Sequence, residues 1–256
     1  MYNLDDATLY RYSRQTAFEK IGVEGQKKLF SSSVAIIGLG ALGSVIANNL
    51  CRAGIGRMRL IDQDYVDLSN LPRQVLFDEE DAAAKRSKAE AVFNHLSKIN
   101  SKTLLEPVMV HVDFYNIEEL IKDVDLVLDG SDNMEVRFIV NEACHKLNIP
   151  WIFGGVLGSG GNCMNIIPGK SPCLRCFMPN ISPAFSFPTC AAAGVLNMTS
   201  NIIASLESAE AIKILTGSPD INRKLFVLDV WNNTAEYLDL AKNSDCPVCG
   251  RRAPDA

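Results

Sequence analysis

The chain has 256 residues, of which 47% are hydrophobic and 21% are charged, proportions that are ordinary for a folded globular protein. Its formal net charge of -5 disfavours broad, nonspecific binding to nucleic acid. The chain has no uninterrupted apolar run of about 18 residues, so we expect no transmembrane helix. The N-terminus lacks a basic region followed by an apolar stretch, so we also expect no secretory signal and a cytoplasmic location.

The first part of the chain predicts a layered α/β fold. Residues 5–30 predict one or two helices with a turn near Gly22. Strands and helices then alternate, which predicts a Rossmann-like, mostly parallel sheet with helices on both faces. The expected strands are 33–38, 57–62, 104–110, 124–129 and 150–154, and the expected helices are 41–54, 87–99, 116–122 and 133–147.

The second part predicts an antiparallel extension of that sheet. Residues 154–167 resemble two short strands that turn back at a glycine-rich segment, and residues 224–230 and 234–240 resemble a hairpin. The proline-rich stretch 168–190 predicts a loop that cannot form a regular helix, and 191–216 predicts a long helix. We expect a single domain with N-terminal helices (1–30), a nucleotide-binding core (31–155) and a remaining part (156–256).

A glycine-rich turn follows the first expected strand. Gly38, Gly40 and Gly43 lie between that strand and a helix, and Asp62 ends the next strand. In such a turn, one glycine permits the bend, one lets the backbone approach a phosphate, and one lets helix and strand pack closely. The helix N-terminus favours negative charge, and the carboxylate can accept hydrogen bonds from ribose hydroxyls. The pattern predicts nucleotide binding but does not separate NAD from ATP.

The polar residues after Asp62 favour ATP. They are Asn70, Arg73, Gln74, Lys85, Arg86 and Lys88. The triphosphate of ATP carries about four negative charges, and nucleotidyl transfer needs cations that hold charge building on pyrophosphate. We assign Arg73 and Lys88 to the phosphates, and we interpret Lys85 and Arg86 as solvated residues at the start of a helix.

A second acidic segment follows the strand 124–129. Asp132 would face a bound triphosphate, so we expect it to coordinate Mg²⁺, because two anions repel unless a metal lies between them. The alternative is that Asp132 only caps the helix that starts at Asn133. We expect Asp129 to be structural and Arg137 to hold Asp132 or Asp64 in place.

The cysteines group into two Cys-x-x-Cys pairs, Cys173 with Cys176 and Cys246 with Cys249. Four thiolates suit a tetrahedral Zn²⁺ ion, which would tether the C-terminal tail to the loop near Cys173 as a flap. For either pair alone, the alternative is a thioredoxin-like redox pair. Cys51 and Cys144 are interpreted as core residues, and Cys163 is assigned no role.

Several motifs together resemble the MoeB/ThiF adenylyltransferases, the bacterial relatives of ubiquitin-activating enzymes. The resemblance covers nearly the whole chain in order. It rests on Arg11-Tyr12-Ser13-Arg14-Gln15, the glycine turn, Asp62-Gln63-Asp64, Leu68-Ser69-Asn70-Leu71-Pro72-Arg73-Gln74, Ser87-Lys88-Ala89-Glu90, Leu128-Asp129-Gly130-Ser131-Asp132-Asn133, the two cysteine pairs, Thr189-Cys190 and Glu207-Ser208-Ala209-Glu210-Ala211-Ile212-Lys213.

The resemblance implies that a small ubiquitin-like sulfur carrier attacks ATP with its C-terminal Gly-Gly carboxylate, giving an acyl-adenylate and pyrophosphate for later thiocarboxylate formation. It implies ATP and Mg²⁺ as cofactors beside Zn²⁺, and a carrier-binding role for residues 156–256. ATP contacts fall on Gly38, Gly40, Gly43, Asp62, Asp64, Asn70, Arg73, Gln74, Lys88 and Asp132. The matching aspartate, here Asp132, is required for adenylation in that family.

Two residues have roles that the resemblance leaves open. It implies that Arg14 reaches the γ-phosphate of a neighbouring subunit, hence a homodimer, although Arg14 could equally pair with a surface acid. It implies for Cys190 either a covalent or sulfur-handling role or, as in other relatives, a dispensable one at the start of a helix. We expect sulfur to come from a separate sulfurtransferase or cysteine desulfurase.

Other functions remain open at this point. The same fold could activate a peptide or a small-molecule carboxylate, and the carrier pathway could be that of thiamin or of molybdopterin. An NAD-dependent oxidoreductase would leave Arg73, Lys88, Asp132 and the cysteines without a shared purpose. A noncatalytic carrier-binding scaffold would not need the phosphate-facing residues.

Overall fold

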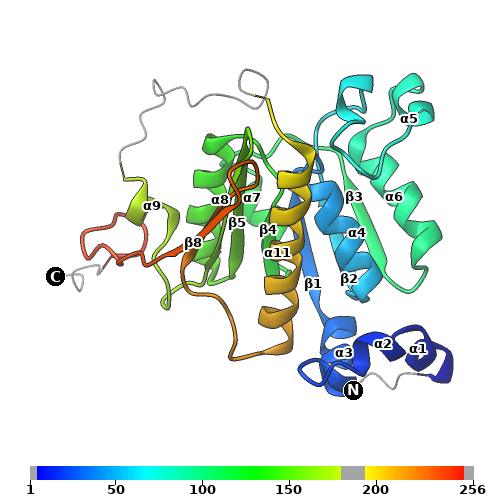
Figure 1. The fold of residues 1–256 in the computed structure, drawn as a ribbon, viewed down its shortest axis with the longest axis horizontal. Helices are drawn as coiled ribbons and strands as arrows, with labels where there is room; N and C mark the ends of the chain where they lie inside the picture. Colours follow the sequence, from blue (N-terminus) through cyan, green and yellow to red (C-terminus); the bar gives the residue numbers. More distant parts are fainter. Residues whose placement is uncertain (1–4, 180–193, 251–256) are drawn as a thin grey trace.

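The computed structural model describes residues 5–179 and 194–250, and this part of the chain is built around one mixed β-sheet (Figure 1). The strand order is β3-β2-β1-β4-β5-β6-β7-β8. The strands from β3 to β5 in this order are parallel, and β5 to β8 are antiparallel to their neighbours. Their bounds are β1 Ser33–Ile37, β2 Arg57–Ile61, β3 Leu104–Val108, β4 Leu126–Asp129, β5 Trp151–Leu157, β6 Gly160–Ile166, β7 Leu225–Asp229 and β8 Thr234–Leu238.

Helices cover both faces of the sheet, as the alternating pattern predicts. Their bounds are α1 Asp6–Arg11, α2 Ser13–Thr16, α3 Gly22–Ser31, α4 Gly43–Ala53, η1 Leu68–Asn70, α5 Glu79–Ala83, α6 Lys88–Ile99, α7 Ile117–Ile121, α8 Met134–Leu147, α9 Leu174–Phe177 and α11 Asn197–Thr216. In Figure 1, α4 and α11 lie in front of the sheet, and α7 and α8 lie behind it. Among the described residues, no helix is both long enough and apolar enough to span a membrane.

Side-chain alternation along the strands builds two cores. In β1, Val34 and Ile36 join the core under α4, α6 and α11, while Ala35 and Ile37 join the core under α7 and α8. Successive strand residues point to opposite faces, so a strand covered on both sides must be apolar throughout. This explains why β1 and β4 are continuous apolar runs in the sequence. The confirmed fold class is therefore α/β with an antiparallel extension.

Capping residues set the ends of the helices that frame the sheet. Ser87 begins α6 by accepting a hydrogen bond from the backbone N–H of Glu90, and Asn133 begins α8 in the same way through Glu135. Gly54 and Gly217 end α4 and α11 in the left-handed conformation, with φ of 85° and 75°. The stop expected near residue 217 is confirmed.

Several element predictions were wrong. The N-terminal segment forms three helices, and the loop after β2 carries η1 and α5, where Asp78 caps α5. The expected strand 150–154 and the first of the two short strands are one strand, β5. The expected proline loop contains the helix α9, which fits between Pro172 and Pro179; the rest of that loop lies outside the described residues. The described part of the long helix begins at Asn197.

Candidate functional site

A cavity of about 630 Å³ opens at the carboxyl ends of β1, β2 and β4. This is the edge of an α/β sheet where ligands bind, because the strand order reverses between β1 and β4. The cavity continues across β5, β6 and β7, so it has a polar end and a second end over the antiparallel strands. Of the residues expected to bind nucleotide, the cavity is lined by Gly38, Gly40, Asp62, Asp64, Asn70, Arg73, Gln74, Lys88 and Asp132.

The three glycines of the turn have different surroundings. Gly38 has a φ of 85°, and a Cβ there would lie 2.7 Å from the carbonyl of Gly130. A Cβ on Gly43 would lie 1.8 Å from the Gly38 carbonyl oxygen, so these two glycines permit close packing of the turn against α4 and β4. Gly40 is open: a Cβ there would meet only the Gln74 amide, at 3.6 Å. Gly43 packs the turn and does not itself line the cavity.

Asp62 organises the floor beside this turn. One carboxylate oxygen accepts the Leu39 N–H at 2.7 Å, and the other accepts the Asp64 N–H at 2.8 Å. Burial raises the pKa of Asp62 above its usual value, while Lys88 opposes that shift. Each oxygen keeps a further lone pair, so the carboxylate can still accept a hydrogen bond from a ligand hydroxyl.

Lys88 provides a buried cation at the polar end. It is the first residue of α6, it is only 6% exposed, and its Nζ lies 2.9 Å from a carboxylate oxygen of Asp64. The backbone N–H of Lys88 also donates to the Asp64 carbonyl at 2.9 Å. Asp64, whose side chain is 57% exposed, therefore holds the Lys88 ammonium group at the cavity wall, where a ligand anion can also reach the ammonium group.

The η1 segment supplies the next wall. The Asn70 side chain accepts from the Asp67 N–H, and the Arg73 guanidinium donates to the Ser69 carbonyl at 2.7 Å. Gln74 is 3% exposed, and its carbonyl oxygen has no hydrogen-bond partner in the described part of the chain. An amide buried this way has unused hydrogen-bonding capacity, and Gln74 is one of the residues that line the cavity.

Lys85 and Arg86 lie outside this wall. Lys85 pairs with Asp67 at 3.2 Å, and Arg86 pairs with the buried Asp81 at 2.6 Å. Neither residue lines the cavity, and both precede α6 rather than forming its first turn.

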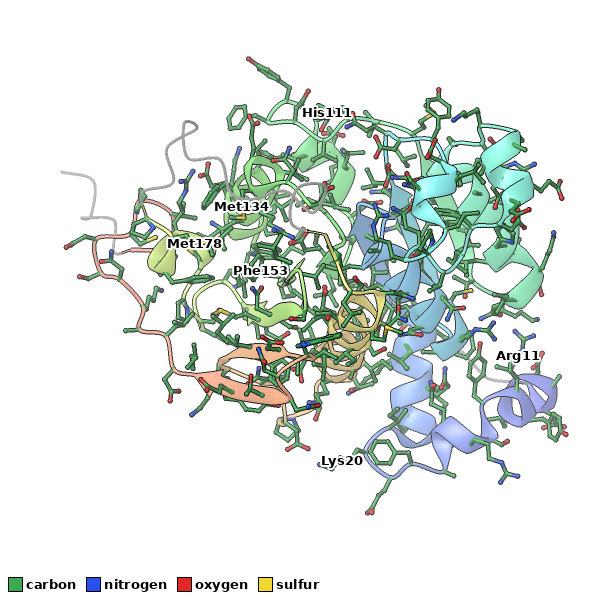
Figure 2. The ribbon with its side chains drawn as sticks, turned by 45° about the horizontal axis from the view of Figure 1, so that its top comes forward. Arg11, Lys20, His111, Met134, Phe153 and Met178 are labelled. Carbon is green, nitrogen blue, oxygen red and sulfur yellow. The ribbon has the colours of Figure 1, made fainter. Side chains whose placement is uncertain are left out.

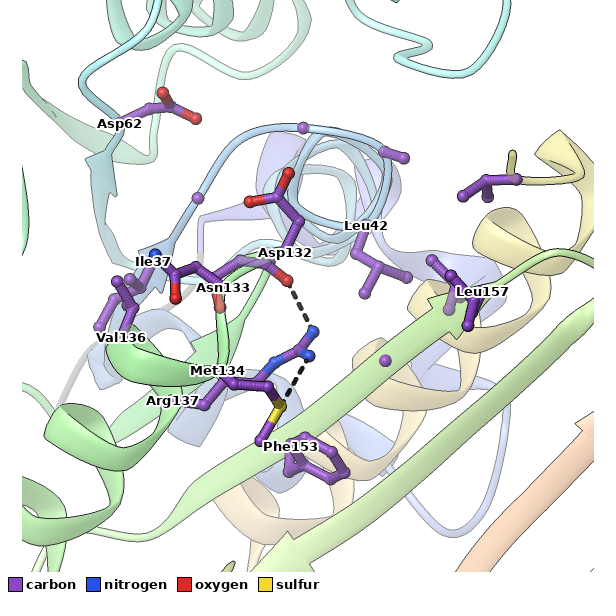
Figure 3. A pocket seen from close by; sticks show the side chains of 18 of the residues that line it. Ile37, Leu42, Asp62, Asp132, Asn133, Met134, Val136, Arg137, Phe153 and Leu157 are labelled. Atoms are coloured by element: carbon purple, nitrogen blue, oxygen red, sulfur yellow. Dashed lines mark hydrogen bonds between the residues drawn. The ribbon is translucent and has the colours of Figure 1, made fainter. Parts of the chain in front are cut away.

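Asp132 projects into the cavity from the turn between β4 and α8. It is exposed, and Asn133 is the residue that caps α8, so the alternative interpretation of Asp132 as the cap is wrong. Figure 3 shows its carboxylate and the Arg137 guanidinium on opposite sides of this turn.

Arg137 does not hold Asp132 or Asp64, contrary to expectation. Its Nε donates to Asp129 at 2.8 Å, and its Nη2 donates to the carbonyls of Ser131 at 2.7 Å and Gly154 at 2.8 Å. The reason is that Arg137 lies on the first helical turn of α8. From there its guanidinium points beneath the loop that carries Asp132 and over the Phe153 ring. Arg137 therefore ties the Asp132 turn to β5, and Asp129 is its structural partner.

The ThiF family model matches residues 12–248. This chain belongs to the ThiF family. It is 38% identical over 244 residues to the sulfur carrier protein ThiS adenylyltransferase of Bacillus subtilis, covering 94% of this chain and 72% of that protein. It is 34% identical over 248 residues to a sulfur carrier protein adenylyltransferase of Thermus thermophilus, covering 94% of this chain and 91% of that protein.

A solved structure also superimposes on this ThiF-family chain. The structure of Escherichia coli MccB with ATP aligns with a TM-score of 0.80 at 25% identity, over 94% of this chain and 74% of that one. The resemblance expected from the motifs is confirmed at the level of both family and fold.

The four paired cysteines of this ThiF-family chain meet away from the cavity. The sulfur of Cys173 lies 3.5 Å from that of Cys246, and the sulfur of Cys176 lies 3.2 Å from that of Cys249. All four sulfurs lie within 4.8 Å of one another. A tetrahedral Zn²⁺ with Zn–S bonds of about 2.3 Å separates its sulfurs by roughly 3.8 Å, so the donor set fits this ion. The contacts join one motif to the other, which a pair of independent redox motifs does not require.

Arg14 and Cys190 are not placed in the cavity. Arg14 is exposed on α2, below the amino ends of the strands in Figure 1, whereas the cavity opens at their carboxyl ends. Figure 2 shows the same separation, with Arg11 and Lys20 at one end of the molecule and His111 at the other. Cys190 lies outside the described residues.

Some lining residues of the cavity had not been expected from the sequence. Val110, His111 and Val112 follow β3, and the His111 ring lies 2.9 Å from the Gln63 side chain. The sequence did contain a signal for these three residues, because the carboxyl end of every parallel strand meets this edge of the sheet. Phe153, Asn162 and Val227 had none, since only the strand order places them here.

Proposed function

We propose that this ThiF-family protein is an adenylyltransferase that activates the C-terminal Gly-Gly carboxylate of a small ubiquitin-like sulfur carrier with ATP. The observation that carries the proposal is one cavity with two ends, a polar end beside the glycine turn and a continuation over β5 to β7. The first end suits a nucleotide and the second suits an extended tail. The names of the Bacillus and Thermus relatives support a sulfur carrier as the substrate.

The proposed nucleotide contacts follow from the side chains at the polar end. The glycine turn and the N-terminus of α4 would bind phosphate through backbone N–H groups, and Asp62 would accept ribose hydroxyls. Arg73 and Lys88 would neutralise charge on the phosphates. The further polar contacts would be Asp64, Asn70 and Gln74.

Asp132 would hold Mg²⁺, and the residues at this end fit that ion because carboxylate oxygens are ligands that Mg²⁺ prefers. The bound ion would neutralise phosphate charge during transfer. Asp64 lies at the same end of the cavity as Asp132, but its carboxylate is paired with Lys88.

The proposed reaction forms a bond between a carboxylate oxygen of the carrier and the α-phosphorus of ATP. The bond between the α-phosphorus and its bridging oxygen breaks, and pyrophosphate leaves with that electron pair. The carboxylate is already ionised at neutral pH, so no general base is required. The contribution of the protein would be alignment and neutralisation of charge.

The acyl-adenylate would then serve thiocarboxylate formation, as in thiamin or molybdopterin biosynthesis. Residues 156–256 would provide the carrier-binding part together with the zinc-bound part. The four cysteines would hold one Zn²⁺ that fastens the tail to the segment before α9.

The test is ATP–pyrophosphate exchange by the purified protein with Mg²⁺ and a Gly-Gly-ending carrier such as Bacillus subtilis ThiS. We expect exchange that depends on the carrier, and a loss of about 100-fold or more in Asp132→Ala, because charge stabilisation at such sites is worth that much. The matched control is Glu135→Ala, an exposed residue of the same helix start that does not line the cavity.

ATP–pyrophosphate exchange at the wild-type rate in Asp132→Ala would contradict the proposed mechanism. Tight ATP binding without exchange, across a panel of Gly-Gly carriers, would instead favour a peptide or small-molecule carboxylate as the substrate.

A further inference from the structure

One row of residues crosses the floor of the cavity on three strands. Gly155 on β5 pairs with Asn162 on β6, and Asn162 pairs with Val227 on β7. Residues directly opposite one another in antiparallel strands point to the same face of the sheet. All three line the cavity.

The direction of the Asn162 side chain follows from its neighbour. A Cβ on Gly161 would lie 2.5 Å from the Ile203 side chain, so residue 161 faces α11. Asn162 therefore points to the opposite face. There it lies over the bare backbone of Gly155, where an added Cβ would come within 3.0 Å of the Asn162 Oδ1.

The Asn162 amide has unused hydrogen-bonding capacity. Its Oδ1 is buried and has no hydrogen-bond partner in residues 5–179 and 194–250. A buried acceptor left unpaired is unfavourable, so a donor from a ligand would be favoured here. The same cavity is lined by the apolar side chains of Val227, Leu157 and Met178, and apolar surroundings strengthen such a bond.

This amide lies beside the end of the cavity that holds Asp132. Arg137 donates to both the Ser131 carbonyl, next to Asp132, and the Gly154 carbonyl, next to Gly155. A chain that runs over Gly155 therefore leads toward the Asp132 turn.

We propose that Asn162 makes the enzyme selective for substrates whose carboxylate ends a peptide chain. Its side-chain amide would bind the main chain of the substrate's tail. Its Oδ1 accepts a peptide N–H, and its Nδ2 donates to a peptide carbonyl. A side-chain amide offers one acceptor and a donor group side by side, which complements a peptide unit. The absence of a side chain at Gly155 leaves room for the Asn162 amide itself, whose Oδ1 a Cβ there would meet at 3.0 Å. This proposal rests on the proposed function and adds the feature of the substrate that is recognised.

The experiment compares three semisynthetic forms of Bacillus subtilis ThiS in ATP–pyrophosphate exchange. One has the native tail, and each of the others replaces one of the last two peptide bonds by an ester, which removes a single N–H with little change of shape. With the wild-type enzyme, we expect one ester to lower kcat/KM about tenfold. In Asn162→Leu, kcat/KM for the native tail should fall by a similar factor, and that ester should cause no additional loss.

Asn162→Ala removes the amide without adding volume and should repeat the result if Asn162→Leu disturbs the sheet. ATP binding, measured by equilibrium dialysis, should be unchanged in both variants. Two outcomes would overturn the role of Asn162 and leave the proposed function standing. One is full activity of both esters with the wild-type enzyme, and the other is an equal loss of kcat/KM from the ester in the wild type and in the variants. No exchange by the wild type with ThiS or with any other Gly-Gly carrier of the panel would overturn the proposed function together with this proposal.

Discussion

Buried carboxyl groups in and around the sheet differ in whether they have hydrogen-bond partners. Asp129 is 3% exposed and is paired with Arg137, and Asp62 accepts two backbone N–H groups. Glu207 on α11 is fully buried, and neither of its oxygens has a hydrogen-bond partner among the described residues. It lies against β5, where a Cβ on Gly154 would come 2.0 Å from its Oε1.

Burial raises the pKa of Glu207 well above its usual value; Asp129 adds to the increase, and Arg137 opposes it. The folded protein therefore keeps the proton on Glu207 to a higher pH than an exposed glutamate would. Its protonated form costs much less to bury than a carboxylate would.

The raised pKa of Glu207 predicts a pH-dependent stability. The unfolded chain loses this proton near the usual pKa of 4.5, while the folded chain keeps it to higher pH. Above that pH the folded state binds more protons, so the free energy of unfolding falls as pH rises, by at most about 1.4 kcal/mol per pH unit from this group. Glu207→Gln removes that term. We expect the variant to be more stable than the wild type at pH 8, with a difference that narrows toward pH 4.5.

Urea unfolding at several pH values measures this difference. The exposed Glu236→Gln variant is the control and should follow the wild type at every pH. Identical slopes of stability against pH for wild type and Glu207→Gln would contradict the burial of a neutral acid.

At the scale of elements, the cysteine cluster joins segments that are distant in the chain. Cys173 directly precedes α9 and Cys176 lies within it, whereas Cys246 and Cys249 follow β8. The Asn243 N–H also approaches the Cys176 sulfur, at 3.5 Å. A metal at this point would fasten the tail to α9.

Zinc analysis should therefore find about one ion per chain. Cys249→Ser should lose the ion, because three thiolates and a hydroxyl make a weaker site, and a chelator should lower the wild-type Tm by about 2 to 4 °C for each kcal/mol lost. Cys163→Ala is the matched control, because Cys163 is a buried cysteine of β6 outside the cluster. A wild-type protein that contains no metal as purified, and whose Tm does not change when the chelator is added, would contradict the zinc site.

Element prediction succeeded where the signal was local. The turn glycines and the period of apolar residues located the parallel strands and their crossover helices. It failed for η1, α5 and α9, which have three to five residues each. Segments this short have no complete apolar period, so capping and contacts with other elements decide them.

At the scale of the whole molecule, Arg14 lies far from the cavity of its own chain. Arg14 is exposed on α2, at the other end of the sheet, and does not line that cavity; the family resemblance implies a role for it in the cavity of a second copy. We propose a homodimer in which each cavity is completed by the partner chain.

Mixing Arg14→Ala with Asp132→Ala subunits, after exchange of chains, should restore activity. Random pairing in a twofold dimer makes half of the dimers mixed, with one intact site each, so about a quarter of the wild-type activity should return. Lys88→Ala mixed with Asp132→Ala is the control and should show no rescue, because both residues line the same cavity of one chain. Equal failure of both mixtures would indicate sites contained within one chain.

Local patterns in the sequence are enough to predict the parallel core and the polar end of the site. Gly38 and Asp62 directly follow β1 and β2, and Asp132 lies in the turn after β4; the carboxyl ends of parallel strands must meet at one edge. No local pattern predicts that Arg137 binds Asp129, that Glu207 is buried or that Asn162 lies in the cavity floor. These positions depend on the order of the strands and on the packing of α8 and α11, which bring together residues that no local pattern relates.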